Sequence, residues 1–103
     1  MSFMIIAELA IFPTSEGVSA SQYVRVAVAA LKKTGLTIRT GPMATCIEAP
    51  DLSAIFAAVT AAHQAIAELG ARRIHIDLRI DDRHDKDATM AAKLHSLGKD
   101  NYA

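Results

Sequence analysis

The segment MATCIE places a hydroxyl and a carboxylate, from Thr45 and Glu48, among apolar residues. A hydroxyl both donates and accepts hydrogen bonds and a carboxylate accepts them, so the two groups can hold a polar ligand in one orientation. Glu8 is a third candidate, because it interrupts an apolar run and a buried carboxylate is costly unless it is paired. The alternatives are exposure of Glu48 at a strand end and an ion pair of Glu8 with Arg39 or Arg79.

Other reactive side chains give weaker signals. Cys46 has no flanking base or cation to turn it into a thiolate, so we expect an inert thiol. The segment 75–85 is rich in His and Asp, but its spacing matches no zinc or calcium site, which favours solvated ion pairs and no bound metal. His63 lies beside an apolar stripe, and we expect it at a helix–sheet or subunit boundary, with a pocket role as the alternative.

Composition limits the functional classes. The 103 residues include 11 basic and 11 acidic ones, so no net charge favours nucleic acid or an anionic membrane. No apolar run approaches the roughly 20 residues of a spanning helix. The single cysteine excludes an intrachain disulfide and suits a reducing compartment, which predicts a cytoplasmic protein. No cofactor is predicted.

Hydrophobic periodicity predicts the elements. We expect strands over residues 3–12, 36–40, 43–49 and 71–82, helices over 19–35 and 52–69, and a short helix over 87–97. Ser19 or Ser21 is expected to cap the first helix, and Asp51 the second. The inward residues of the first helix are predicted to be Val24, Ala27, Val28 and Leu31. The second helix carries an apolar stripe of Leu52, Ile55, Phe56, Val59, Ile66 and Leu69.

The order βαββαβ is that of the ferredoxin-like, split βαβ fold, an α+β architecture in one domain spanning residues 1–103. Both helices are expected on one face of a four-stranded antiparallel sheet. The opposite face would carry Met4, Ile6 and Phe12, which are too apolar to leave in water. We therefore expect a homodimer or homotetramer joined through this open sheet face.

The segments MIIAELAIFP, GPMATCIEAPDL and RIHIDLRIDDRHD, in this order, resemble the family of small single-domain thiamine-binding proteins. These are relatives of the two-repeat proteins that bind thiamine and its hydroxymethylpyrimidine moiety. The resemblance runs over about residues 4 to 97 and implies non-catalytic binding of one of these ligands by a homo-oligomer. The family often has Gly where this chain has Ala44 and Ala49, and a methyl group at position 44 would narrow a pocket there.

On this resemblance, Glu48 and Thr45 are the first ligand-binding candidates and Glu8 is the next. The candidate neighbours of the flat ring are Phe12, Tyr23 and Met43. Strict strand alternation puts Thr45 and Glu48 on opposite faces, so a bulge or a pocket shared between subunits would be needed to join them. Two alternatives stay open: a small ferredoxin-like enzyme, and a structural or regulatory oligomerisation module.

Overall fold

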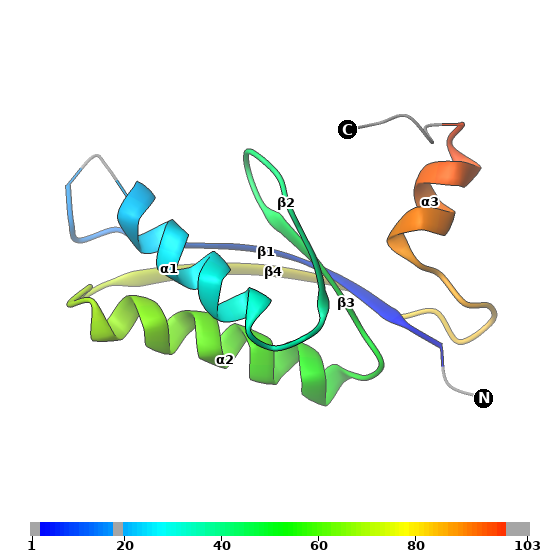
Figure 1. The fold of residues 1–103 in the computed structure, drawn as a ribbon, viewed down its shortest axis with the longest axis horizontal. Coiled ribbons are helices and arrows are strands. Elements are labelled where there is room, and N and C mark those ends of the chain that lie inside the picture. The colour runs from blue at the N-terminus through cyan, green and yellow to red at the C-terminus, as the bar shows by residue number, and fades with distance from the viewer. Residues whose placement is uncertain (1–2, 18–19, 99–103) are drawn as a thin grey trace.

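The chain follows the predicted βαββαβ order and ends in a short third helix (Figure 1). The computed structural model describes residues 3–17 and 20–98. The elements are β1 (Ile5–Pro13), α1 (Ser21–Lys32), β2 (Thr37–Thr40), β3 (Thr45–Ala49), α2 (Leu52–Glu68), β4 (Ile74–Asp81) and α3 (Met90–Ser96). Within the described ranges, no helix is long and apolar enough to cross a membrane.

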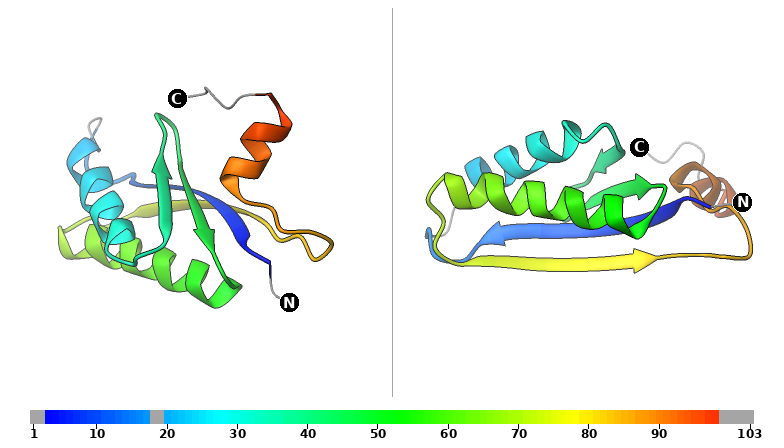
Figure 2. Two further views of the ribbon diagram at one scale, coloured as in Figure 1. Left: turned by 45° about the vertical axis from the view of Figure 1, so that its right-hand side comes forward. Right: turned by 90° about the horizontal axis from the view of Figure 1, so that it is seen from below.

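The four strands form one antiparallel sheet in the order β2-β3-β1-β4. Helices α1 and α2 lie side by side against one face of this sheet, whereas the short α3 stands at its far end (Figure 2). The predicted ferredoxin-like α+β fold is therefore confirmed. The face of the sheet that α1 and α2 leave uncovered is called the open face below.

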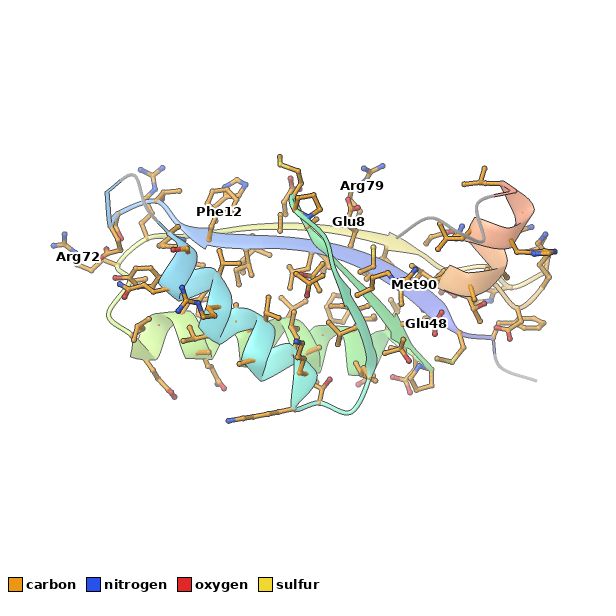
Figure 3. All side chains as sticks on the ribbon, turned by 45° about the horizontal axis from the view of Figure 1, so that its top comes forward. Glu8, Phe12, Glu48, Arg72, Arg79 and Met90 are labelled. Atoms are coloured by element: carbon orange, nitrogen blue, oxygen red, sulfur yellow. The ribbon has the colours of Figure 1, made fainter. Side chains whose placement is uncertain are left out.

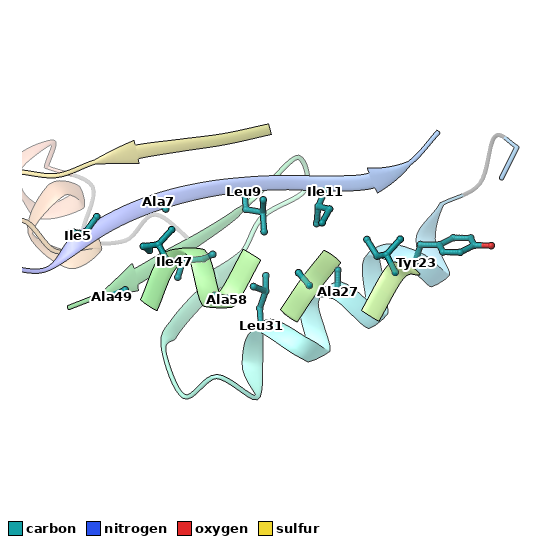
Figure 4. Close-up of a cluster of buried hydrophobic side chains, with 13 residues drawn as sticks. Ile5, Ala7, Leu9, Ile11, Tyr23, Ala27, Leu31, Ile47, Ala49 and Ala58 are labelled. Atoms are coloured by element: carbon teal, nitrogen blue, oxygen red, sulfur yellow. The ribbon is translucent and has the colours of Figure 1, made fainter. Parts of the chain in front are cut away.

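The core forms where β1 and β3 meet the two long helices (Figure 4). Alternation along β1 turns Ile5, Ala7, Leu9 and Ile11 toward the helices, and all four are buried. The largest fully buried side chains are Leu9, Leu31, Ile47, Ile55 and Ile66. They come from both helices and both central strands, so one contiguous cluster joins the two layers.

The prediction for the apolar stripe of α2 is only partly correct. Leu52, Phe56 and Leu69 are 41%, 51% and 45% exposed. The buried face of this helix consists instead of Ile55, Ala58, Ala62 and Ile66. The small alanines let α2 pack closely against both α1 and the sheet. The buried face of α2 is therefore the one that permits this close packing, and not the one with the largest apolar side chains.

The two predicted helix caps have different outcomes. Asp51 caps α2, because its carboxylate accepts a hydrogen bond from the Ala54 N–H at 2.8 Å. The first helix begins at Ser21 itself, directly after Ala20, which provides no side-chain cap. The prediction for Ser21 is therefore wrong, and Ser19 lies outside the described residues.

Candidate functional site

A cleft of about 140 Å³ opens between α1, β1 and the turn that joins β2 to β3. It is lined by residues 9–12 of β1, by the α1 face that carries Val24 and Val28, and by residues 40–45 of the hairpin. The lining is mostly apolar, with the Thr45 hydroxyl as a polar exception. A concave, largely apolar site with few polar groups is typical of small-molecule binding.

The unequal lengths of the strands create this cleft. β1 pairs with β4 as far as Pro13, but it pairs with β3 only from Ile5 to Leu9. Beyond Leu9, the chain of the β2–β3 hairpin turns back, and the Gly41 N–H donates to the Ala44 carbonyl at 2.8 Å. The last part of β1 therefore has a strand on one side and the cleft on the other.

Three of the predicted ligand-binding residues meet at this cleft. Thr45 is 6% exposed and opposes Leu9 on the helix side of the sheet. Phe12 is 37% exposed, and its ring lies 5.0 Å from the His75 ring, measured between centroids. Met43 is 87% exposed at the tip of the hairpin. All three residues line the cleft, but alternation along β1 turns the Phe12 side chain to the open face, whereas the Thr45 hydroxyl lies on the helix side.

Glu8 and Glu48 lie on the opposite side of the sheet from Thr45. In the register of β1 with β3, Glu8 opposes Cys46 and Ile6 opposes Glu48, and pairing continues without a bulge. The alternation argument, which separated Thr45 from Glu48, is therefore confirmed. The cleft and the two carboxylates are separate features of one subunit.

Glu8 forms an ion pair with Arg79 on the neighbouring strand, at 3.9 Å between Oε1 and Nη1 (Figure 3). This is one of the two pairings predicted for Glu8. The Arg79 side chain is largely exposed, so the pair contributes little to stability. Burial, and next the charge of Glu8, raise the pKa of the Cys46 thiol, which makes it a poor nucleophile at neutral pH.

Glu48 connects the sheet to α3. Its Oε1 accepts a hydrogen bond from the Met90 N–H at 2.6 Å, across 42 residues of sequence (Figure 3). Two further contacts hold the same C-terminal segment: Lys93 Nζ lies 2.6 Å from Asp81 Oδ2, and the Met4 N–H donates to Asp87 Oδ1 at 3.0 Å. The sequence carried no signal for this role. Any carboxylate placed near the first amides of a helix can accept a hydrogen bond from them, and only the fold determines which carboxylate is placed there.

The loss of this contact should loosen α3. We expect Glu48→Ala to accelerate hydrogen exchange of the Met90 amide, because that amide loses its carboxylate acceptor. Glu48→Gln is the matched control, since its amide oxygen still accepts a hydrogen bond. Exchange measured by NMR that is equally slow in the Ala variant would contradict a tethering role for Glu48.

With this geometry established, comparison with known proteins identifies the family. The model of a family described as thiamine-binding protein matches residues 7–98. This match includes β1 from Ala7 onward, the cleft and the end of α3. The chain belongs to the thiamine-binding protein family.

Two archaeal proteins are similar to this chain over nearly their whole length. A UPF0045 protein of Methanothermobacter thermautotrophicus is 41% identical over 95 residues, which is 91% of this chain and 96% of that protein. A UPF0045 protein of Methanocaldococcus jannaschii is 37% identical over 101 residues, covering 96% of this chain and 99% of that protein. The resemblance seen in the sequence is thus confirmed.

Solved structures share the fold. A hypothetical protein of Methanocaldococcus jannaschii superposes with a TM-score of 0.86 at 35% identity, over 93% of this chain and 97% of that one. A Thermotoga maritima protein, provisionally named a thiamine biosynthesis/salvage protein, superposes with a TM-score of 0.77 at 18% identity. The alignment covers 91% of this chain and 98% of that one, and at this identity it shows the fold alone.

The two alanines for which the sequence resemblance suggested glycine, Ala44 and Ala49, lie in different places. Ala44 lines the cleft, so its methyl group takes some of the space that glycine would leave. Ala49 is fully buried in the core, at the end of β3. Of these two residues, only Ala44 therefore bears on the shape of the cleft.

Tyr23, the remaining predicted ring neighbour, lies in the core rather than in the cleft lining. Its side chain is 7% exposed, and its hydroxyl donates to Glu16 Oε1 at 3.3 Å. Ser15 also donates to Glu16 and is the main reason that the pKa of this carboxyl is lowered. The Ser15 oxygen in turn accepts from the Arg72 and Arg73 amides at 3.1 Å, which ties the loop after β1 to the start of β4.

The acidic segment after β4 forms local ion pairs. Asp82 lies 3.0 Å from His84 and raises the pKa of that imidazole, mainly through their hydrogen bond. Arg83 pairs with Asp85 and lowers the pKa of its carboxyl to about 2. Across residues 3–17 and 20–98, no three His, Cys, Asp or Glu side chains are grouped so that they could hold a metal ion.

Proposed function

We propose that this protein binds thiamine, or the hydroxymethylpyrimidine moiety of thiamine, without transforming it. The observation that carries the proposal is a cleft, in a member of the thiamine-binding family, that is bordered by Phe12, Met43 and Thr45. The titratable residues named above lie elsewhere, and the described residues that line this cleft include no acid or base. General acid–base catalysis needs such a group within reach of the substrate, so its absence favours binding over turnover.

The size of the cleft favours the pyrimidine half of the ligand. A cavity of about 150 Å³ accommodates a benzene-sized ring, and this cleft has about 140 Å³. One six-membered ring fits, and the thiazolium of thiamine would extend past the exposed Met43. The Thr45 hydroxyl supplies a polar contact on the helix side of the cleft, and Val24 and Val28 supply apolar surface there.

Glu8 and Glu48 define a second candidate locus on the open face. A carboxylate on this face would attract the cationic thiazolium ring of thiamine. A neighbouring subunit would have to cover the ligand to complete such a site. The cleft is the better supported of the two loci, since Glu8 already pairs with Arg79 and Glu48 with the Met90 amide.

Calorimetric titration with thiamine and with hydroxymethylpyrimidine tests the function. Both should bind, and Thr45→Val should weaken binding roughly 2- to 10-fold, the usual effect of one hydrogen bond. Thr37→Val, at an exposed site on β2 away from the cleft, should bind as the native protein does. The absence of heat at millimolar ligand would exclude the function, and a weakened Glu8→Gln variant beside an unchanged Thr45→Val variant would move the site to the open face.

We further propose that a second copy covers the open face, in a homodimer or homotetramer. The face carries Met4, Ile6 and Phe12 together with the Glu8–Arg79 pair, a mixture typical of an interface between subunits. Light scattering should give a multiple of the 11.0 kDa chain mass. Ile6→Asp should reduce it, whereas Gln64→Asp on the exposed side of α2 should not, and a native mass of one chain would refute the assembly.

We propose the cytoplasm as the location of this protein, because the free, partly buried Cys46 suits a reducing compartment. Cell fractionation that recovers the protein outside the cytoplasm would refute this.

A further inference from the structure

The backbone of β1 has an unpaired edge inside the cleft. In an antiparallel ladder, opposed residues alternate between pairs that exchange hydrogen bonds and pairs whose N–H and C=O groups point outward. The Gly41 N–H bonds the Ala44 carbonyl, which makes these two a hydrogen-bonded pair at the end of the β2–β3 hairpin. The next pair, Thr40 with Thr45, is then of the other kind, so the backbone groups of Thr45 point away from β2 and toward Leu9 of β1.

The same alternation continues along β1. The N–H and C=O of Leu9 face β3, those of Ala10 face β4, and those of Ile11 face the β3 side again. Pairing with β3 ends at Leu9, so among residues 3–17 and 20–98 no strand lies opposite the backbone groups of Ile11 on this side. Pro13, two residues on, has no N–H at all. Ile11 is therefore the residue of this edge that offers both a donor and an acceptor to the cleft.

These two groups lie within a suitable binding environment. Within one extended residue, the N–H and C=O on the same side project in parallel, as they do toward a partner strand. The cleft beside them has space for one six-membered ring, with Phe12 and Met43 at its border and the Thr45 hydroxyl on its helix side. A flat ligand can thus take the place that a continued β3 would occupy.

We propose that the main chain of Ile11 recognises a six-membered nitrogen heteroaromatic with an amino group next to a ring nitrogen. The Ile11 N–H donates to the ring nitrogen, and the Ile11 carbonyl accepts from the amino group. The inference deepens the proposed function, because the 4-aminopyrimidine of thiamine has this edge, but the chemical class extends to any ring with the same edge. Recognition by the main chain requires neither Glu8 nor Glu48.

Two measurements on the full chain test this recognition. Oxythiamine replaces the amino group by an oxo group, which presents an acceptor to the Ile11 carbonyl and an N–H to the Ile11 amide. We expect it to bind about 30-fold more weakly than thiamine, or worse, because two polar groups lose their partners in the cleft. Thiamine should also slow hydrogen exchange of the Ile11 amide at least about tenfold. The control is the Ile76 amide, which opposes Ile11 on β4 and points to the outer edge of the sheet.

The outcomes separate this inference from the proposed function. If thiamine binds, but oxythiamine binds equally well and exchange at Ile11 is unchanged, recognition by the main chain is overturned and thiamine binding stands. If thiamine does not bind but 4-aminopyrimidine protects the Ile11 amide, the recognition stands and the thiamine proposal falls. If neither compound binds or protects, both proposals are overturned.

Discussion

Replacement of Val24 by Trp should abolish thiamine binding while the protein stays folded. Val24 lines the cleft from α1 and is 37% exposed, so an indole at this position can enter the cleft without displacing the core. Val and Trp have similar helix propensities, so the helix itself should tolerate the change. Calorimetry should then detect no binding at thiamine concentrations that saturate the native protein.

The matched control is Gln22→Trp, which adds the same ring on the same helix at an exposed position outside the cleft lining. It should bind thiamine with native affinity, and both variants should melt within a few degrees of the native protein. Native affinity in a folded Val24→Trp variant would exclude this cleft as the binding site, whatever the family relationship.

Two neighbouring residues of α2 should differ widely in their contribution to stability. Ile55 is fully buried, whereas Phe56, the larger residue, is 51% exposed. Ile55→Ala should lower the free energy of unfolding by about 2–5 kcal/mol, because it removes buried methyl groups and leaves a cavity. Phe56→Ala should cost less than about 1 kcal/mol in an isolated subunit, as expected for a change at the surface.

Urea unfolding of both variants, monitored by circular dichroism, gives these two values. Equal losses for the two substitutions would show that Phe56 is buried in solution, by a partner subunit or by a different packing of α2. A small loss at Ile55 would contradict the described core.

Some features of the core between the sheet and the helices could be predicted from residues that are close together in the sequence. The alternation of β1 correctly predicted that Ile6 and Phe12 lie on the face opposite the helices, because a strand imposes a period of two on its own side chains. The cap by Asp51 could be predicted for the same reason, since the capping contact lies within one helical turn. The apolar stripe of α2 could not show whether Phe56 or Ala58 is buried. Both residues are compatible with a helix, and packing against the neighbouring elements determines which of them is buried.

The candidate site divides in the same way. The family resemblance suggested Phe12, Met43 and Thr45 as contacts for a ligand with a flat ring, and strand alternation separated Thr45 from Glu48. The cleft itself depends on where β3 stops pairing with β1, and the engagement of Glu48 depends on a helix 42 residues away. Neither the cleft nor the Glu48 contact depends on a local sequence pattern, so neither could be predicted from residues that are neighbours in the sequence.

The sequence by itself determined the order of the elements, the ferredoxin-like fold and the family, because each rests on short-range periodicity or on similarity along the chain. Only the tertiary structure decided that Phe12, Met43 and Thr45 line one cleft, that β1 stops pairing with β3 at Leu9 beside it, and that Glu48 bonds the Met90 amide at the start of α3. The physical reason is that these features arise from contacts between distant segments, whose register and lengths are set by packing of the whole chain.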